Sequence, residues 1–316
     1  MEDQAQCIAQ SKPFEFLIGP DEVAFFIHRG LVKQHSEPLD ALVNGRMKEA
    51  KAGSASIVDV DEATFARVTE FMYTGDYSAA DFSLILDAAG INETGSAGPT
   101  EVQATEQVDS TVNADFQDPA DSGFDDPIPS QDDGWGGHYS RKKKKRRNAP
   151  APYMDPVVKP AENTTTRKSR AWQVFTSRPS PIQSSRKLQP SCEPRPNKEP
   201  CEEYTDVFLS HAKLYVFADT YDIAGLRALS LHKLHKTLAC FTLYDQRVED
   251  VAVLFQYTYN NTAEREGTLD PLRKLVVSYV CCHIEKILVC DTFRATLKGE
   301  NSAAVDVLEK VRARLD

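Results

Sequence analysis

The sequence predicts an α+β fold that is interrupted by a long charged insertion. Short apolar runs separated by turn residues occupy the first part of the 316-residue chain, and helical periodicity dominates after residue 205. Between these parts the chain loses any regular apolar pattern, and 14 of its 18 prolines lie between residues 99 and 200. These three observations predict a sheet-containing start, a helical end, and a tract between them that builds no core.

The first elements are expected to be two paired strands and a short helix. Residues 14–18 (FEFLI) and 23–27 (VAFFI) are apolar runs on either side of the turn-forming sequence GPDE. Residues 27–36 then have apolar side chains at helical spacing. Pro38 ends this helix, because proline disfavours helical backbone angles at the residue before it.

Three further elements complete this region. Residues 38–45 predict a helix that ends at an Asn-Gly pair, and residues 55–60 predict a strand. The clearest helix is expected over residues 61–75, with Asp61 near its start and Gly75 at its end.

The insertion is acidic first and basic afterwards. Residues 81–140 contain thirteen acidic side chains and no lysine or arginine, whereas residues 141–200 contain sixteen basic and four acidic ones. Such a segment has too little apolar surface to offset an ordering cost of about 1–2 kcal/mol per residue. We therefore predict that residues 92–203 are disordered.

Helical patterning resumes after the insertion and continues to the last residue. Asp270 followed by Pro271 predicts a helix start, since proline in the first turn loses no hydrogen bond. Ser302 is expected to cap the last helix, with Val305, Leu308 and Leu315 on its apolar face.

Residues on both sides of the insertion resemble one known family. The N-terminal part is similar to the first two-thirds of a BTB/POZ domain, and the segment after residue 205 is similar to the remaining third. The matching residues are His28-Arg29, Ser36, residues 57–61 and Tyr73-Thr74-Gly75 before the insertion, and Tyr215, Ala218, Asp219 and Tyr221 after it.

The resemblance implies that two separated pieces make a single domain. Residues 12–80 and 205–240 would form the two parts of a BTB/POZ fold, a small mixed sheet flanked by a helical cluster. Residues 92–203 would then be an insertion at an exposed connection, where added length costs little. Residues 241–316 look like the helical C-terminal extension of fungal BTB proteins.

The same resemblance implies a non-enzymatic protein-interaction module that forms a homodimer. Phe25, Leu31 and Leu39 are the expected dimer face. Met47 and Glu49 match the hydrophobic-x-Glu pattern with which adaptors of cullin-3 ubiquitin ligases contact their partner. The alternative interpretation is an exposed loop with an ordinary charge, because the pattern is short.

A run of seven cations suggests a second class of function. The run consists of Arg141, Lys142, Lys143, Lys144, Lys145, Arg146 and Arg147. It predicts a nuclear import signal read by importin, with a nucleic-acid contact or a merely solvated charge run as alternatives. The competing hypothesis is a nuclear regulatory protein whose insertion, rather than its folded domain, contacts nucleic acid or chromatin.

Several other classes are not expected. The spacing of Cys281, Cys282 and His283 is unlike that of zinc ligands, and no metal site or other cofactor is predicted. No catalytic motif or phosphate-binding loop is present, so we expect neither an enzyme nor a small-molecule substrate. Without a signal peptide or an apolar run of membrane length, the protein is expected inside the cell, in the nucleus, the cytoplasm or both.

Overall fold

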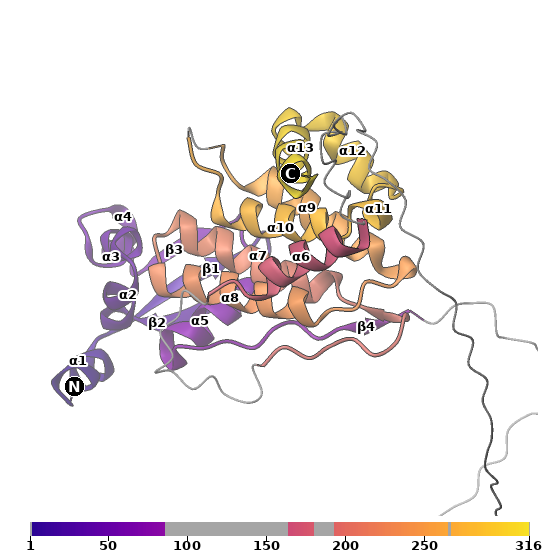
Figure 1. Cartoon of the computed structure of the whole chain (residues 1–316). Helices are drawn as coiled ribbons and strands as arrows, with labels where there is room; N and C mark the ends of the chain where they lie inside the picture. The colour runs from indigo at the N-terminus through magenta and orange to yellow at the C-terminus, as the bar shows by residue number, and fades with distance from the viewer. Residues whose placement is uncertain (1, 86–163, 180–192, 265–266, 316) are drawn as a thin grey trace, which may run out of the picture. The chain divides into compact units, whose positions relative to one another are not determined.

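The computed structural model of the chain describes residues 2–85, 164–179, 193–264 and 267–315. These residues all belong to one compact unit of the chain. They combine one three-stranded sheet, one two-stranded sheet and a larger number of helices, which confirms the predicted α+β class (Figure 1). Within the described part of the chain, no helix is long and apolar enough to cross a membrane.

The larger sheet is built around its first strand. Strand β1 (Pro13–Ile18) pairs antiparallel with β2 (Val23–His28) and parallel with β3 (Ser54–Ile57), so the strand order is β2-β1-β3. Every second residue of β1 faces the core, as expected for a strand with one covered face. These buried residues are Phe14, Phe16 and Ile18. The predicted hairpin is thereby confirmed.

Five helices accompany this sheet. They are α1 (Glu2–Gln10), α2 (Arg29–His35), α3 (Glu37–Asn44), α4 (Lys48–Ala52) and α5 (Glu62–Thr74). Helix α5 begins where the Asp61 side chain accepts a hydrogen bond of 2.8 Å from the Thr64 N–H, and ends at Gly75, whose φ of 77° is left-handed. Both ends were predicted from the residue types, because aspartate satisfies free N–H groups and glycine adopts positive φ without strain.

Helices α7 (Thr205–Thr220) and α8 (Ala224–Cys240) connect two apolar cores. Leu214 and Phe217 of α7 pack into the core that contains the sheet and α5. Phe208 and Tyr215 of the same helix pack into the core of the C-terminal helices. The segments before and after the insertion therefore share one interior.

Specific contacts bind the two segments to each other. The rings of Phe65 in α5 and Phe217 in α7 lie 6.0 Å apart, edge to face. The Ser36 hydroxyl donates a hydrogen bond of 2.6 Å to the backbone carbonyl of Tyr221. Both an apolar and a polar contact thus join the segment before the insertion to the segment after it.

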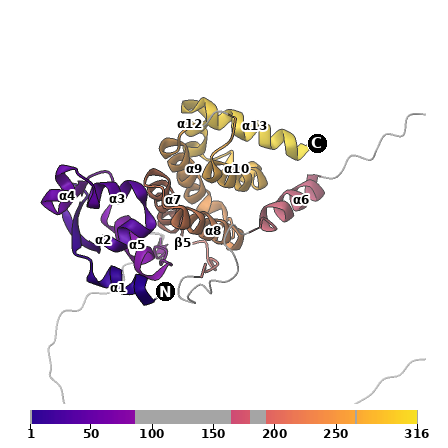
Figure 2. The same cartoon turned by 90° about the vertical axis from the view of Figure 1, so that its left-hand side faces the viewer.

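The C-terminal helices pack on α7 and α8 (Figure 2). They are the 3₁₀ helix η2 (Asp245–Arg247), α9 (Val248–Asn261), α10 (Pro271–Cys282), α11 (Ile284–Ile287), α12 (Asp291–Gly299) and α13 (Asn301–Leu315). Asp270 caps α10 by accepting from the N–H of Leu272, and Pro271 is its first residue. This predicted start is confirmed.

The predicted apolar face of α13 is wrong for Val305 and Leu308, and the side chain of Leu315 lies outside the described residues. Ala303 and Val307 of this helix are buried, while Val305 and Leu308 are exposed. Ala303 and Val307 lie four residues apart and belong to the core of the C-terminal helices, so they share the inner face of α13.

The predicted disorder of residues 92–203 is wrong for two stretches of that range. Residues 164–176 form helix α6 (Thr164–Thr176), and residues 193–203 are ordered and end in strand β5 (Glu202–Glu203). Strand β5 pairs antiparallel with β4 (Ser83–Leu84). Residues 92–163 and 180–192 lie outside the described residues.

Tertiary contacts account for the order of α6. Phe175 is only 4% exposed, and its backbone carbonyl lies 2.8 Å from Nε2 of His235. Trp172 stacks on Phe175 at 5.5 Å and meets the edge of Tyr279 at 6.2 Å. One aromatic pair at helical spacing therefore anchors an otherwise polar helix.

Side-chain pairs hold residues 193–203 as well. Arg195 forms an ion pair of 2.6 Å with Glu202. The Asn197 side chain donates to the carbonyl of Thr242 at 2.9 Å and accepts from its N–H at 2.6 Å. A few paired polar groups thus supply the order that the apolar content of this stretch does not.

Candidate interaction site

The two residues predicted to contact a cullin lie together at the start of α4. Met47 directly precedes the helix and is 57% exposed, while Glu49 lies in its first turn and is partly exposed. Gly53 ends the helix with a left-handed φ of 82° and leads into β3. An exposed apolar side chain thus lies two positions before a partly exposed carboxylate.

Arg29 attaches this segment to the rest of the fold. Its guanidinium donates to the carbonyl of Val43 in α3 at 2.7 Å and to that of Ala50 in α4 at 3.3 Å. The same group lies over the ring of Phe14, 5.0 Å from its centroid. The partly buried Arg29 guanidinium therefore links α3, α4 and the sheet. These contacts hold in place the segment that carries Met47.

This surface offers one exposed apolar side chain and one partly exposed carboxylate. A partner with an apolar pocket and a nearby cation would complement Met47 and Glu49. Within the described ranges, no group of His, Cys, Asp and Glu side chains is arranged to hold a metal ion. Burial raises the pKa of the Cys281 thiol to about 12 and that of Cys282 to about 11, which keeps both thiols protonated.

The predicted dimer face is wrong for two of its three residues. Leu31 is 5% exposed and Leu39 is 1% exposed, because both pack into the chain's own core. Phe25 is partly buried, with its ring 5.2 Å from that of Phe65. The neighbouring Phe26 is instead 61% exposed, on a strand that pairs with β1 on only one side. Side chains already enclosed by the core have little surface left for a second chain.

A buried polar network, absent from the predicted sites, fixes the chain where it leaves α5. The Lys233 ammonium in α8 forms an ion pair of 2.5 Å with Asp76 and donates to the Tyr77 carbonyl. It also lies over the Tyr77 ring, 4.4 Å from the centroid. The Tyr77 hydroxyl lies 2.8 Å from Nδ1 of His211 in α7. This network ties the end of the N-terminal segment to both helices that follow the insertion.

A sequence signal for Lys233 existed. It lies four residues after Leu229, which is buried, and four before Thr237, so helical periodicity puts it on the inner face of α8. A lysine on such a face requires a partner, because an unpaired buried charge is costly. The sequence around Lys233 does not indicate that Asp76 is this partner.

We predict that His211 makes the fold sensitive to acid. Burial, together with the positive charges of Lys233 and Arg67, lowers the pKa of His211 to about 3, below its ordinary value of 6.5. Below pH 6.5 the unfolded chain binds a proton that the folded chain does not, so stability falls as the pH falls. By about pH 5 the loss should be about 2 kcal/mol, measured by urea unfolding.

The variant His211→Asn serves as the comparison. It should lose less stability than the wild type between neutral pH and about pH 5. Burial raises the pKa of Asp250 to about 6, so protonation of this carboxyl stabilises the folded state as the pH falls. This effect is the same in the wild type and the variant, and it cancels when their stability losses are compared. Equal losses in the two proteins would contradict the assignment to His211.

The basic run predicted as an import signal, residues 141–147, lies outside the described residues. Comparison of the chain with protein-family models, with curated proteins and with solved structures gives no match in any of the three.

Proposed function

We propose that the chain is a non-enzymatic protein-interaction module of the BTB/POZ type, and that its α4 surface recruits a cullin-3-type scaffold. The observation that carries this proposal is the exposure of Met47 beside Glu49 on a segment that Arg29 holds in place. The resemblance supplies the family. The core shared by the segments on either side of the insertion agrees with what that family requires.

The expected contribution of Met47 follows from its exposed apolar surface. Transfer of a methionine side chain from water into an apolar pocket stabilises a complex by about 1.5–3 kcal/mol. The support from Arg29 lowers the entropic cost of presenting this side chain, since the loop need not be ordered on binding. Glu49 would add orientation through a charge-assisted hydrogen bond.

Substituting both residues should weaken the interaction while leaving the fold intact. We expect Met47→Ala combined with Glu49→Ala to weaken binding to purified cullin-3 by about tenfold or more, measured by calorimetry and by co-purification. The matched control is Leu308→Ala combined with Glu309→Ala, an exposed leucine and glutamate on α13. Binding that survives the first pair of substitutions, or fails equally with the control, would refute this surface.

Self-association forms the second part of the proposal, with the edge of β2 as its surface. Phe26 and Ala24 lie exposed on this strand, and an edge strand offers free backbone groups to a second chain. Light scattering of the full chain should give the mass of a dimer, and Phe26→Asp should give that of a monomer. Val305→Asp, at an exposed site on α13, should stay dimeric. A monomeric wild type would exclude this part of the proposal.

A further inference from the structure

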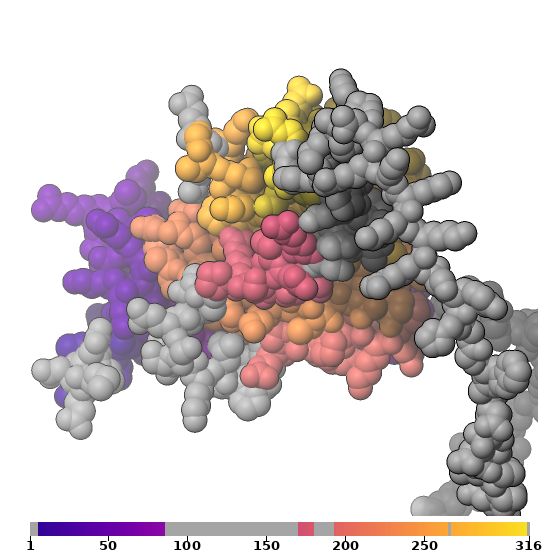
Figure 3. All heavy atoms as spheres, in the orientation of Figure 1, coloured from indigo at the N-terminus to yellow at the C-terminus, as the bar shows by residue number. Residues whose placement is uncertain are grey.

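A groove between three helices collects positive charge. Helices α6, α10 and α13 line an open groove of about 720 Å³, and Figure 3 shows α6 in rose beside α10 and α13. The described residues that line it include no carboxylate and five cations, which are Arg170, Arg178, Lys274, Lys310 and Arg314. We call this feature the cationic groove.

Within the part of the chain that the structure describes, only one of these cations has a carboxylate partner. Arg314 pairs with Glu285 at 2.9 Å and donates to the carbonyl of Cys281 at 2.6 Å, so it holds α13 against α10. No ion pair among the described residues involves the other four cations. Burial lowers the pKa of Arg178, as expected for a partly desolvated charge without an anion beside it.

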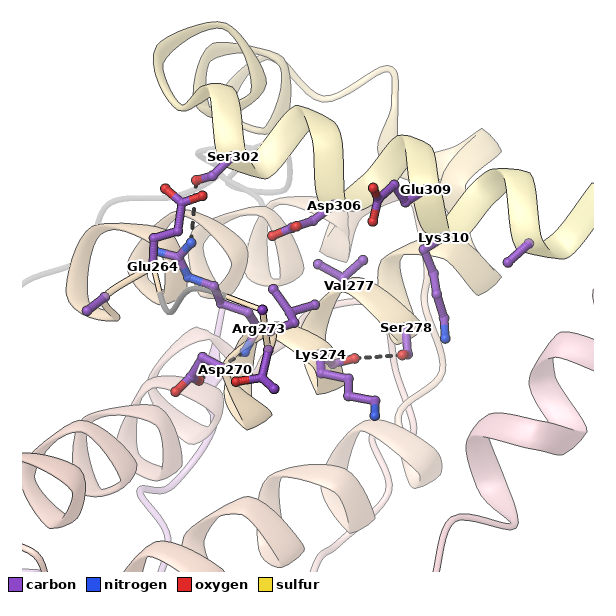
Figure 4. Close-up of a pocket in the computed structure, with 15 residues that line it drawn as sticks. Glu264, Asp270, Arg273, Lys274, Val277, Ser278, Ser302, Asp306, Glu309 and Lys310 are labelled. Atoms are coloured by element: carbon purple, nitrogen blue, oxygen red, sulfur yellow. Dashed lines mark hydrogen bonds between the residues drawn. The ribbon is translucent and has the colours of Figure 1, made fainter.

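A second pocket, lined by several carboxylates, lies next to the cationic groove. Lys274 and Lys310 also border this second pocket, whose other side carries Glu264, Asp306 and Glu309. Figure 4 shows the side chains of both lysines extending away from the Asp306 carboxylate. Their ammonium groups are therefore available on the side of the groove.

An apolar wall distinguishes the groove from a simple anion site. Val174 of α6 is 67% exposed and lines it together with Ala171 and Pro179. Phosphate groups alone would leave this wall in water, whereas an acidic peptide with apolar side chains would use both surfaces. The volume also lies within the range of about 300–1,000 Å³ typical of ligand pockets.

We propose that the cationic groove binds an acidic peptide segment of a partner protein, with apolar residues interleaved among the carboxylates. Carboxylates of the peptide would pair with Lys274, Lys310 and Arg178, and its apolar side chains would cover Val174. The site is separate from Met47 and does not rest on the cullin interaction. It gives the chain a second binding surface on its C-terminal helices.

Fluorescence anisotropy on the full chain tests this proposal. The probe is a labelled peptide in which aspartate and glutamate alternate with leucine and phenylalanine. Lys274→Glu combined with Lys310→Glu should weaken its binding by about tenfold or more. Lys33→Glu combined with Lys298→Glu, at two exposed lysines elsewhere, changes the net charge equally and should have little effect. All variants should unfold at the temperature of the wild type, because every substituted lysine is exposed.

Two companion probes identify what the groove recognises. A peptide with every acid replaced by its amide should not bind. A single-stranded DNA oligonucleotide should bind without being affected by the Lys274→Glu and Lys310→Glu substitutions. If the oligonucleotide instead loses its binding with these substitutions and the peptide does not, the groove is a nucleic-acid site and the proposal is wrong.

Zero-length carbodiimide crosslinking, read by mass spectrometry, controls for the basic run. The acidic peptide should attach to Lys274 and Lys310. Crosslinks confined to residues 142–145 would show that the run alone attracts the peptide, and would overturn the proposal.

Discussion

Replacing Lys233 with methionine is expected to destabilise the fold by about 3–5 kcal/mol, measured by urea unfolding. The Lys233 side chain is 2% exposed and the Asp76 side chain 10% exposed, so the substitution removes the cation that pairs with the Asp76 carboxylate in a nearly dry site. Removing one member of a buried ion pair is costly for this reason. The substitution also removes the hydrogen bond that the Tyr77 carbonyl accepts from the same ammonium.

Two further variants separate the charge from the packing. Lys233→Met combined with Asp76→Asn removes both charges and should recover much of the lost stability. Lys236→Met changes an exposed lysine on the same helix and should cost less than about 0.5 kcal/mol. If Lys233→Met were no more harmful than Lys236→Met, the ion pair would not fix the chain as described.

Two replacements of the insertion should have opposite results. Exchanging residues 92–160 for a flexible Gly/Ser linker of about 20 residues removes none of the described structure, so the unfolding midpoint should change little. Exchanging residues 92–203 removes α6 and the pairs made by Arg195 and Asn197. This second replacement should cost several kcal/mol, since burial of Phe175 alone is worth about 3–5 kcal/mol.

Point substitutions in α6 provide a matched control. Phe175→Ala should cost about 3–5 kcal/mol, whereas Val174→Ala, at the exposed neighbouring position, should cost less than about 0.5 kcal/mol. Circular dichroism with thermal unfolding measures both. Equal stability of the two linker replacements would mean that α6 does not contribute to the fold.

Elements with strong local signals were predictable. Asp61 and Gly75 define α5, Asp270 and Pro271 start α10, and the alternating apolar residues of β1 define a strand. Each of these signals acts through the backbone of its own segment. Local chemistry is therefore sufficient to find them.

Elements that depend on distant partners were not predictable in this way. Helix α6 carries few apolar residues, and its order comes from contacts of Trp172 and Phe175 with Tyr279, more than a hundred residues later. Periodicity alone likewise could not tell which side of α13 meets its neighbours. Tertiary packing decides both cases.

The candidate sites also differ in whether local sequence or tertiary contacts define them. Met47 and Glu49 are recognisable as a short linear pattern, but their attachment through Arg29 is a tertiary contact. Leu31 and Leu39 were assigned to a dimer face, because helical spacing identifies an apolar side chain without saying whether it meets its own core or another chain. The cationic groove is lined by α6, α10 and α13, and about a hundred residues of sequence separate α6 from the other two helices. No single stretch of sequence therefore contains the site.

The pairing of β4 with β5 has a consequence for protein engineering. Ser83 lies opposite Glu203 and Leu84 opposite Glu202, so the polypeptide is closed at this point like the stem of a hairpin. Once such a stem is closed, doubling the length beyond it costs only about 0.6 kcal/mol. A fluorescent reporter or an affinity tag inserted between residues 92 and 160 would therefore be joined to the domain at both ends and should destabilise it little.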